Sequence, residues 1–368
     1  MQPSEVQPIR QYWQLCQRDL FPVLEEQIGG LSDAYRMLAA ALALLGDGNI
    51  AAPVQGRRGR PALDRLPILR AFVAKAFLNL ATTRQLLQQL QQDVQLRQLC
   101  GWNSSRRLPS ESMFSRVFAE LAASGLVERL QTGLVQEVYR DHLVGHVIRD
   151  ATAVPVRQHA ERKKPQPVPE PRRRGRPRKG ETPPASSPSR IQRQSAMTLE
   201  QMLQDLPRVC DWGLKLDEKG RKQWWKGFKF HCDISDAGLP LSCVLTSASL
   251  HDSQAAIPLA TVTSQRVQAL YELMDAGYHS QLLRNYCEAL GHVVLIPDVE
   301  RQGKPSLPMA PAQRQRYALR TLIERFFARL KDDFGLRHVR VRGHAKVQLH
   351  VLLAVLMFTL EQILRMST

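Results

Sequence analysis

Four polar residues near the end of the chain have the spacing of one helix face. They lie in the run RQRYALRTLIERFFARLKDDFG and comprise a phenol, two cations and a carboxylate: Tyr317, Arg320, Lys331 and Glu324. At about 100° per residue they project within a stripe roughly 60° wide, and the apolar residues of the run fall on the opposite side. The spacing predicts an amphipathic helix that holds a carboxylate rigidly between cations. The alternative is a solvated helix face without chemistry.

Two further carboxylates occur where strands are expected. Asp150 lies inside the β-branched run HVIRDATAVPV, and Asp275 ends the strand-like run LYELMD. A carboxylate inside such a run either faces water from an edge strand or belongs to a site. The residues around Asp150 alone leave both interpretations open.

The order of elements brings the three carboxylates together. Residues 11–142 have helical periodicity throughout, and the later elements follow the order β–β–β–α–β–α–β–α. This is an α/β plan with a mixed sheet that resembles the ribonuclease H-like fold, preceded by an all-α N-terminal domain. In that plan the first and fourth strands are neighbours. We therefore expect Asp150 and Asp275 to converge and a following helix to bring Glu324 beside them.

The expected domains follow from these patterns. A helical DNA-binding or assembly domain takes residues 1–142, and the catalytic domain takes 143–156 and 197–345. Residues 157–196 form a disordered basic insertion, and a helix over 346–368 packs on the catalytic domain. Within the first domain, the turn GWNSSRRLP and the helix after it fit a helix-turn-helix that offers Ser112 and Arg116 to a DNA groove, or two plainly packed helices.

Three converging carboxylates predict a particular cofactor. Their charges repel one another unless cations neutralise them. Hard oxygen ligands suit Mg²⁺ or Mn²⁺ better than zinc. Two such ions support in-line phosphoryl transfer. The residues therefore predict a metal-dependent enzyme acting on phosphodiesters.

The charge of the chain favours a polyanionic partner. The 368 residues carry 51 Lys and Arg against 34 Asp and Glu, a net charge of +17, which suits nucleic acid or an acidic membrane surface. Residues 157–196 contribute 12 Lys or Arg against three Glu, or +9, which leaves +8 for the remainder. Within this segment Arg174-Gly175-Arg176-Pro177 resembles an AT-hook, whose Arg side chains enter a narrow minor groove. A nonspecific basic tether is the alternative.

Other patterns narrow the class of protein. The longest uncharged apolar run, residues 348–360, is shorter than a membrane span, and the N-terminus lacks the apolar region of a signal peptide. We expect no membrane partner and a cytoplasmic location. The six cysteines are widely spaced without CxxC pairs, which predicts reduced and mostly buried thiols. For Trp224 and Trp225 we favour packing within their strand over stacking on bases, and for His251 and Asp252 we favour bracing a loop over joining the site.

The carboxylate contexts carry a family resemblance. The run from Tyr317 to Lys331 matches the spacing Y-x2-R-x3-E-x6-K of the DDE transposases of bacterial insertion sequences, in the four/five superfamily. IRDATAVPV resembles the strand of their first Asp, and MDAGYHS the turn of their second Asp. SASLHDS and FGLRHVRVRGHAK also resemble that family. The likeness covers roughly residues 58–365, apart from the basic insertion.

The resemblance implies roles for these residues. Asp150, Asp275 and Glu324 would bind two Mg²⁺ or Mn²⁺ ions and form the catalytic triad. Tyr317, Arg320 and Lys331 would hold transposon-end DNA. The protein would cut double-stranded DNA at the inverted repeats and join the free 3′ ends to target DNA, acting as a homodimer in the synaptic complex at the bacterial nucleoid.

The sequence departs from that pattern in two places. About 15 residues, 298–312, replace the long β insertion that some relatives carry before the Glu helix, and the basic segment after the first Asp strand is an addition. Two alternatives stay open. One is a non-catalytic DNA-binding protein descended from a transposase, and the other is a ribonuclease H-like nuclease or resolvase without strand transfer.

Overall fold

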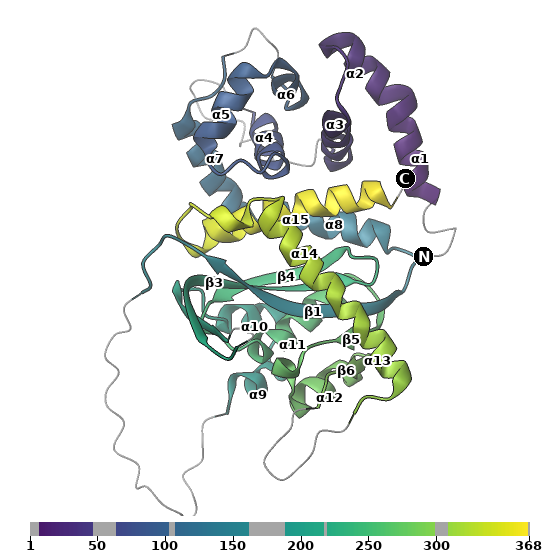
Figure 1. The fold of residues 1–368 in the computed structure, drawn as a ribbon, viewed down its shortest axis with the longest axis vertical. Helices are drawn as coiled ribbons and strands as arrows, with labels where there is room; N and C mark the ends of the chain where they lie inside the picture. The colour runs from purple at the N-terminus through teal and green to yellow at the C-terminus, as the bar shows by residue number, and fades with distance from the viewer. Residues whose placement is uncertain are drawn as a thin grey trace, which may run out of the picture.

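A computed structural model of the chain describes residues 7–46, 64–102, 107–161, 188–216, 219–298 and 308–366. Arg174 and Arg176 of the predicted AT-hook lie outside these ranges. The protein is a mixed α/β structure in which N-terminal helices stand above a curved mixed sheet, with the long helix α15 between them (Figure 1).

The N-terminal region is helical, as the sequence predicts. Its helices are α1 (Gln7–Leu15), a π-helical turn (Cys16–Leu20), α2 (Phe21–Ile28), α3 (Asp33–Leu45), α4 (Leu66–Phe77), α5 (Thr83–Gln92), α6 (Val94–Leu99), α7 (Glu111–Ser124) and α8 (Leu126–Val138). Side-chain caps set several starts, such as Ser32 on Tyr35 and Ser110 on Met113. The helical periodicity of residues 82–99 suggests one helix, but the structure has two, because Asp93 is extended and caps the backbone N–H of Leu96.

The sheet has the strand neighbours expected from the sequence, with one addition. Its strands are β1 (Val144–Pro155), β2 (Asp211–Leu216), β3 (Lys222–Ser235), β4 (Pro240–Ser247), β5 (Ala269–Leu273) and β6 (Val293–Leu295). Their order is β2-β3-β1-β5-β6, and β4 also pairs with β3. The predicted first and fourth strands, β1 and β5, are parallel neighbours. The sequence analysis did not predict β2.

Helices cover both faces of the sheet. These elements are α11 (Ser253–Ser264), a 3-10 turn (Ala276–Tyr278), α12 (Gln281–Ala289), α13 (Pro311–Tyr317), a 3-10 turn (Ala318–Arg320), α14 (Thr321–Asp332), a 3-10 turn (Leu336–His338) and α15 (His344–Arg365). Apolar residues of α14 and α15 share one core with Phe228 and Phe230 of β3, while α11 and α12 share a second core with Met274. Each face of the sheet is therefore buried by its own helices.

The C-terminal end of the predicted basic insertion is folded, which corrects its boundary. Residues 190–194 form the short helix α9, followed by α10 (Leu199–Asp205). The Nε atom of Arg190 lies 2.8 Å from a carboxylate oxygen of Asp205, and its Nη1 atom donates to Gln254 on α11 at 2.7 Å. These bonds attach the segment to the sheet domain, so folded structure resumes before residue 197.

The apolar C-terminal run belongs to a core helix. Among the described residues α15 is long and apolar enough to cross a membrane by length and composition, and the helices over 11–28 and 33–45 meet that criterion only as one pair bent by 117°. Most of α15 is buried inside the protein, as the sequence predicts. All six cysteines are free thiols, and five are buried.

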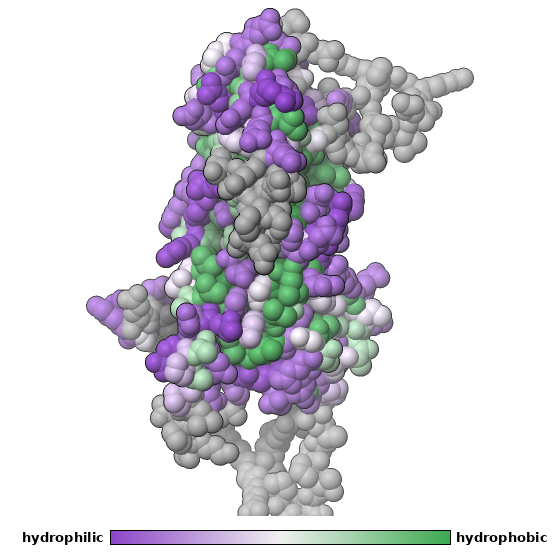
Figure 2. Space-filling view, turned by 90° about the vertical axis from the view of Figure 1, so that its right-hand side faces the viewer, coloured by the Kyte–Doolittle hydropathy of each residue, from purple (hydrophilic) through white to green (hydrophobic). Residues whose placement is uncertain are grey.

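Figure 2 shows the molecule from the side at which β1 begins, with apolar residues gathered between hydrophilic surfaces. Exposed apolar residues near the starts of β1, β5 and β6 include Leu143, Leu270 and Val293.

Candidate active site

Two of the three predicted carboxylates lie side by side at the ends of adjacent parallel strands. In the register of β1 and β5, Ile148 pairs with Leu273. Asp150 and Asp275 each follow two residues later, so they have equivalent positions and point to the same face of the sheet. Both are partly buried, and the charge of Asp275 lies close enough to raise the pKa of Asp150.

Arg320 joins the helix face to Asp150. Its Nη2 atom donates to Oδ2 of Asp150 at 2.9 Å, and its Nη1 atom donates to the hydroxyl oxygen of Tyr317 at 3.0 Å. Both partners in the ion pair are less than one-fifth exposed. The predicted continuous helix is interrupted here, because Ala318–Arg320 form a 3-10 turn between α13 and α14.

Burial dominates the electrostatics of Asp150. It raises the pKa of this carboxyl from its usual value near 4 to about 6, although Arg320 and the backbone N–H of Ala151 favour the ionised form. The neighbouring charges of Asp275 and Asp252 raise the pKa further. One guanidinium therefore does not offset the desolvation of this group.

Lys331 lies farther along β1. Its Nζ atom donates to Oγ1 of Thr152 at 2.6 Å, two residues beyond Asp150 on the same face. Burial lowers the pKa of Lys331, and the positive charges of Lys215 and Arg337 lower it further. Arg320 and Lys331 thus contact β1 from the same side, and Tyr317 is joined to them through its hydrogen bond with Arg320.

Glu324, the third predicted carboxylate, does not join the other residues of the site. It is exposed on α14, one turn after Arg320, and no three His, Cys, Asp or Glu side chains in the described ranges are grouped to hold a metal ion. Arg320 is the group on this helix that contacts Asp150. The structure brings Asp150 and Asp275 together but does not gather the predicted triad.

Asp275 has the features of a carboxylate that can accept a further partner. Its Oδ1 atom is buried without a hydrogen-bond partner in the part of the chain that the structure describes. Gly277 lies directly behind it, since a Cβ atom there would be 3.0 Å from Oδ1. A buried carboxylate oxygen without a partner costs free energy that a hard cation would offset. Asp150 and Asp275 therefore fit a divalent ion by their chemistry.

Tyr278 and Asp252 also belong to this site; the sequence analysis gave Tyr278 no role and favoured a loop-bracing role for Asp252. Tyr278 is fully buried, and its hydroxyl has no hydrogen-bond partner among the described residues. Burial raises the pKa of Tyr278, as do the nearby charges of Asp252, Asp150 and Asp275. Asp252 also braces its loop as expected, because its carboxylate lies 3.0 Å from Nζ of Lys229. The sequence signals for these two residues were the runs MDAGYHS, which contains Tyr278, and SASLHDS, which contains Asp252.

A buried ion network holds the strands in register beneath the site. Arg149, next to Asp150, donates to Asp233 of β3 at 2.8 and 2.7 Å and to Glu272 of β5 at 2.7 Å. All three side chains are almost completely buried. Because one guanidinium joins three neighbouring strands, it fixes the relative levels of β1 and β5 and hence of the two Asp residues.

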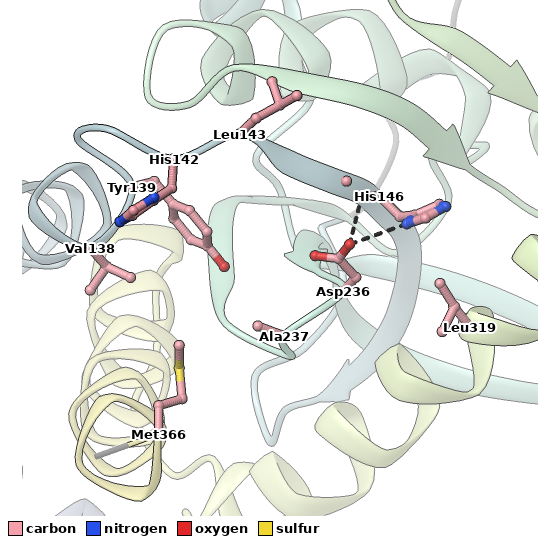
Figure 3. A pocket seen from close by; sticks show the side chains of 10 residues that line it. Val138, Tyr139, His142, Leu143, His146, Asp236, Ala237, Leu319 and Met366 are labelled. Atoms are coloured by element: carbon pink, nitrogen blue, oxygen red, sulfur yellow. Dashed lines mark hydrogen bonds and ion pairs between the residues drawn. The ribbon is translucent and has the colours of Figure 1, made fainter. Parts of the chain in front are cut away.

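The pocket in Figure 3 lies at the other end of β1. Its volume is about 670 Å³, and its lining includes Tyr139, His146, Asp236 and Leu319. A carboxylate oxygen of Asp236 accepts a hydrogen bond from the backbone N–H of His146, and the same oxygen lies 3.1 Å from Nδ1 of the His146 ring. Asp150 does not line this pocket, so the cavity and the paired carboxylates are separate features.

A curved mixed sheet with paired carboxylates on adjacent parallel strands and a basic helix across them is an arrangement for chemistry on a polyanion. The family model described as Transposase DDE domain matches residues 145–360, and Transposase domain (DUF772) matches residues 27–120. The chain therefore belongs to the DDE transposases. Comparisons with curated proteins and with solved structures give no match.

Proposed function

We propose that this protein is the transposase of a bacterial insertion sequence of the four/five superfamily, Y-R-E-K type, with a ribonuclease H-like catalytic domain. The observation that carries the proposal is the equivalent placement of Asp150 and Asp275 on β1 and β5, with Arg320 reaching Asp150 from the helix. The sheet order supports the ribonuclease H-like assignment: on one side of β1, β3 is antiparallel both to β1 and to β4, and on the other side β5 and β6 are parallel to β1.

Asp150, Asp275 and Glu324 are proposed to hold two Mg²⁺ or Mn²⁺ ions. When bound, such ions activate an oxygen nucleophile and stabilise a leaving oxygen in in-line displacement. The basic face of α13 and α14 binds the scissile strand, because Arg320 and Lys331 reach successive residues of one face of β1 and Tyr317 is hydrogen-bonded to Arg320. Arg320 and Lys331 neutralise phosphate charge.

The proposed reaction has two displacements at phosphorus. In the first, water attacks the phosphodiester at the end of the element and the 3′-oxygen leaves as a free 3′-OH. In the second, that 3′-OH attacks a phosphodiester of target DNA and the target 3′-oxygen leaves. Each step forms one P–O bond and breaks one. Two copies of the chain in a synaptic complex would act on the two ends.

The basic segments are proposed to tether DNA. Arg174 and Arg176 would enter an A·T minor groove, and the helix α7 would offer the exposed Ser112 and Arg116 to DNA. These contacts would supply affinity and position without taking part in the chemistry.

The test measures binding and cleavage separately. Asp150→Asn, Asp275→Asn and Glu324→Gln are nearly isosteric and leave the apolar side of α14 unchanged. Inverted-repeat affinity by gel shift should stay within a few-fold, because removing a carboxylate weakens repulsion of phosphate. Mg²⁺-dependent cleavage and joining of a pre-cut end should each fall by orders of magnitude.

Different results separate the alternatives. Wild-type protein that binds the ends without nicking them would identify a non-catalytic DNA-binding protein. Cleavage without joining of pre-cut ends would identify a nuclease or resolvase. Near-normal cleavage by Glu324→Gln alone would remove Glu324 from the triad, which is a sharp test because the structure leaves this side chain exposed.

A further inference from the structure

A two-stranded ribbon extends beyond the main sheet. The pairing of β1 with β3 ends at Pro155 and Gly227, and the pairing of β4 with β3 ends at Ser247 and Phe228. Residues 222–226 of β3 pair with β2. The ribbon therefore projects past both strands that flank β3.

One face of this ribbon combines exposed aromatic rings with lysines. Residues directly opposite in an antiparallel pair share a face, and Trp212 pairs with Lys226 while Leu214 pairs with Trp224. Lys222 lies two residues before Trp224, so β3 presents Lys, Trp and Lys in succession on this face. The exposed fractions are 51% for Trp212, 62% for Trp224 and 47% for Leu214.

The opposite face explains why only one of the adjacent tryptophans is exposed. Trp225 packs over Gly213, because a Cβ atom at position 213 would lie 2.4 Å from its ring. Trp225 thus has the strand-packing role that the sequence analysis favoured, and Trp224 does not. Trp225 and Gly213 therefore pack together on one face of the ribbon, while Trp224 lies opposite Leu214 on the exposed face.

Charge distinguishes this surface from a protein interface. The centres of protein interfaces are enriched in aromatic residues but depleted in lysine, whereas here lysines flank both indoles. On the ribbon's other face, the charge of Lys215 lowers the pKa of Lys331, as does that of Arg337. Lys215 therefore places the ribbon near Lys331, at the basic end of α14.

We propose that the β2–β3 ribbon binds DNA, with Trp212 and Trp224 stacked on unpaired bases beside the cleavage site and Lys222 and Lys226 on phosphates. The inference depends on the proposed function for the presence of DNA at Asp150. β1 leads from Asp150 to the ribbon over five residues, or about 17 Å. At a rise of about 3.4 Å per base, the ribbon contacts nucleotides roughly five steps from the cut bond. Stacking is tolerant of sequence, as contacts beside variable target DNA need to be.

The test compares two double variants on two DNAs. Trp212→Leu with Trp224→Leu removes the rings but keeps apolar side chains, and Trp212→Phe with Trp224→Phe keeps aromatic rings. The DNAs are one inverted-repeat duplex and the same duplex with five unpaired nucleotides beside the cleavage position. Leu270→Ala, at an exposed apolar residue of β5, is the matched control.

Wild-type protein and the Leu270→Ala variant should bind the splayed DNA more tightly than the duplex. The leucine variant should lose roughly tenfold in affinity for the splayed DNA, and the phenylalanine variant should lose much less. Wild-type affinity of the leucine variant for both DNAs would overturn the proposal. Equal losses on both DNAs would overturn the assignment to unpaired bases, and a change in oligomeric state without a change in DNA affinity would assign the face to a second copy of the chain.

The proposed function can fail independently of this surface. If Asp150→Asn cleaved DNA at the wild-type rate, the catalytic assignment would be wrong whatever the tryptophan variants did. If the leucine variant bound splayed DNA normally while Asp150→Asn was inactive, only the ribbon assignment would be wrong.

Discussion

The guanidinium of Arg320 lies 2.9 Å from the carboxylate of Asp150, although the two residues are 170 positions apart in the sequence. Arg320 is thus both the nearest cation to a proposed metal ligand and a proposed phosphate ligand. A divalent ion at Asp150 and the charge of Arg320 repel each other. The pair therefore links metal binding to DNA binding at one side chain.

We predict that Arg320→Ala binds Mn²⁺ more tightly than the wild type at pH 8, by about tenfold, while its affinity for transposon-end DNA falls. Lys331→Ala is the control: it should lose DNA affinity but keep wild-type Mn²⁺ affinity, because Lys331 contacts Thr152. Calorimetric titration of the DNA-free protein measures the ion, and a gel shift measures DNA. Weaker Mn²⁺ binding by Arg320→Ala would show that Arg320 helps to form the metal site.

Much of the fold could be predicted from hydrophobic periodicity and from the order of strands and helices. Which side chains contact one another within the site could not. The strand neighbours β1 and β5, and so the meeting of Asp150 and Asp275, follow from the order of strands and helices. That Arg320, and not Glu324, lies on Asp150 depends on a 3-10 turn and on desolvation, neither of which residue spacing encodes.

The elements that the sequence analysis missed are short or depend on distant contacts. β2 is six residues long and is stabilised by pairing with β3. Helix α9 has five residues within a basic stretch and is held by bonds to Asp205 and Gln254. Alternation along β3 indicates that Trp224 and Trp225 face opposite ways, but Gly213 on the partner strand decides which one packs.

Arg149→Met should destabilise the protein by about 3–5 kcal/mol, because it leaves Asp233 and Glu272 buried without their cation. Without Arg149 the folded-state pKa values of both carboxyls rise. The deficit should therefore be largest at neutral pH and shrink as pH falls towards 4, where protonation removes the buried charges. Urea unfolding at several pH values measures it. The exposed Arg18, paired with Asp19, provides a control variant that should match the wild type, and a deficit independent of pH would point to lost packing instead of lost charge pairing.

His231 should make stability depend on pH below neutrality. Burial lowers its pKa to about 4, so between pH 6.5 and 4 the unfolded chain binds a proton that the folded protein excludes. The unfolding free energy should fall across this window by about 3 kcal/mol from this group. In His231→Gln an amide can keep the hydrogen bond to Thr246 without titrating, so its stability should fall less. Parallel pH profiles for the two proteins would contradict the assignment.

Tyr278→Phe should stabilise the metal-free protein by about 1 kcal/mol, because it removes a buried hydroxyl that has no partner among the described residues. Tyr286→Phe is a matched control of opposite sign, since the Tyr286 hydroxyl lies 2.8 Å from Oγ1 of Thr261. Thermal unfolding measures both. If Tyr278→Phe were destabilised like Tyr286→Phe, the hydroxyl would have a hydrogen-bond partner, with a carboxylate of the site as the first candidate.

Deletion of residues 162–187, which carry nine Lys or Arg and two Glu, should weaken DNA binding without affecting cleavage chemistry. Each lost phosphate contact lowers the slope of log affinity against log salt concentration by close to one unit. The slope should therefore become shallower by several units, while the cleavage rate at saturating protein stays near that of the full chain.

A matched variant with Arg174→Ala and Arg176→Ala retains the rest of the segment. If this variant loses mainly its preference for A·T-rich duplex, the AT-hook interpretation gains support; if it loses affinity equally on A·T-rich and G·C-rich duplexes, the segment acts as a basic tether. An unchanged salt slope after the deletion would show that the segment does not contact DNA.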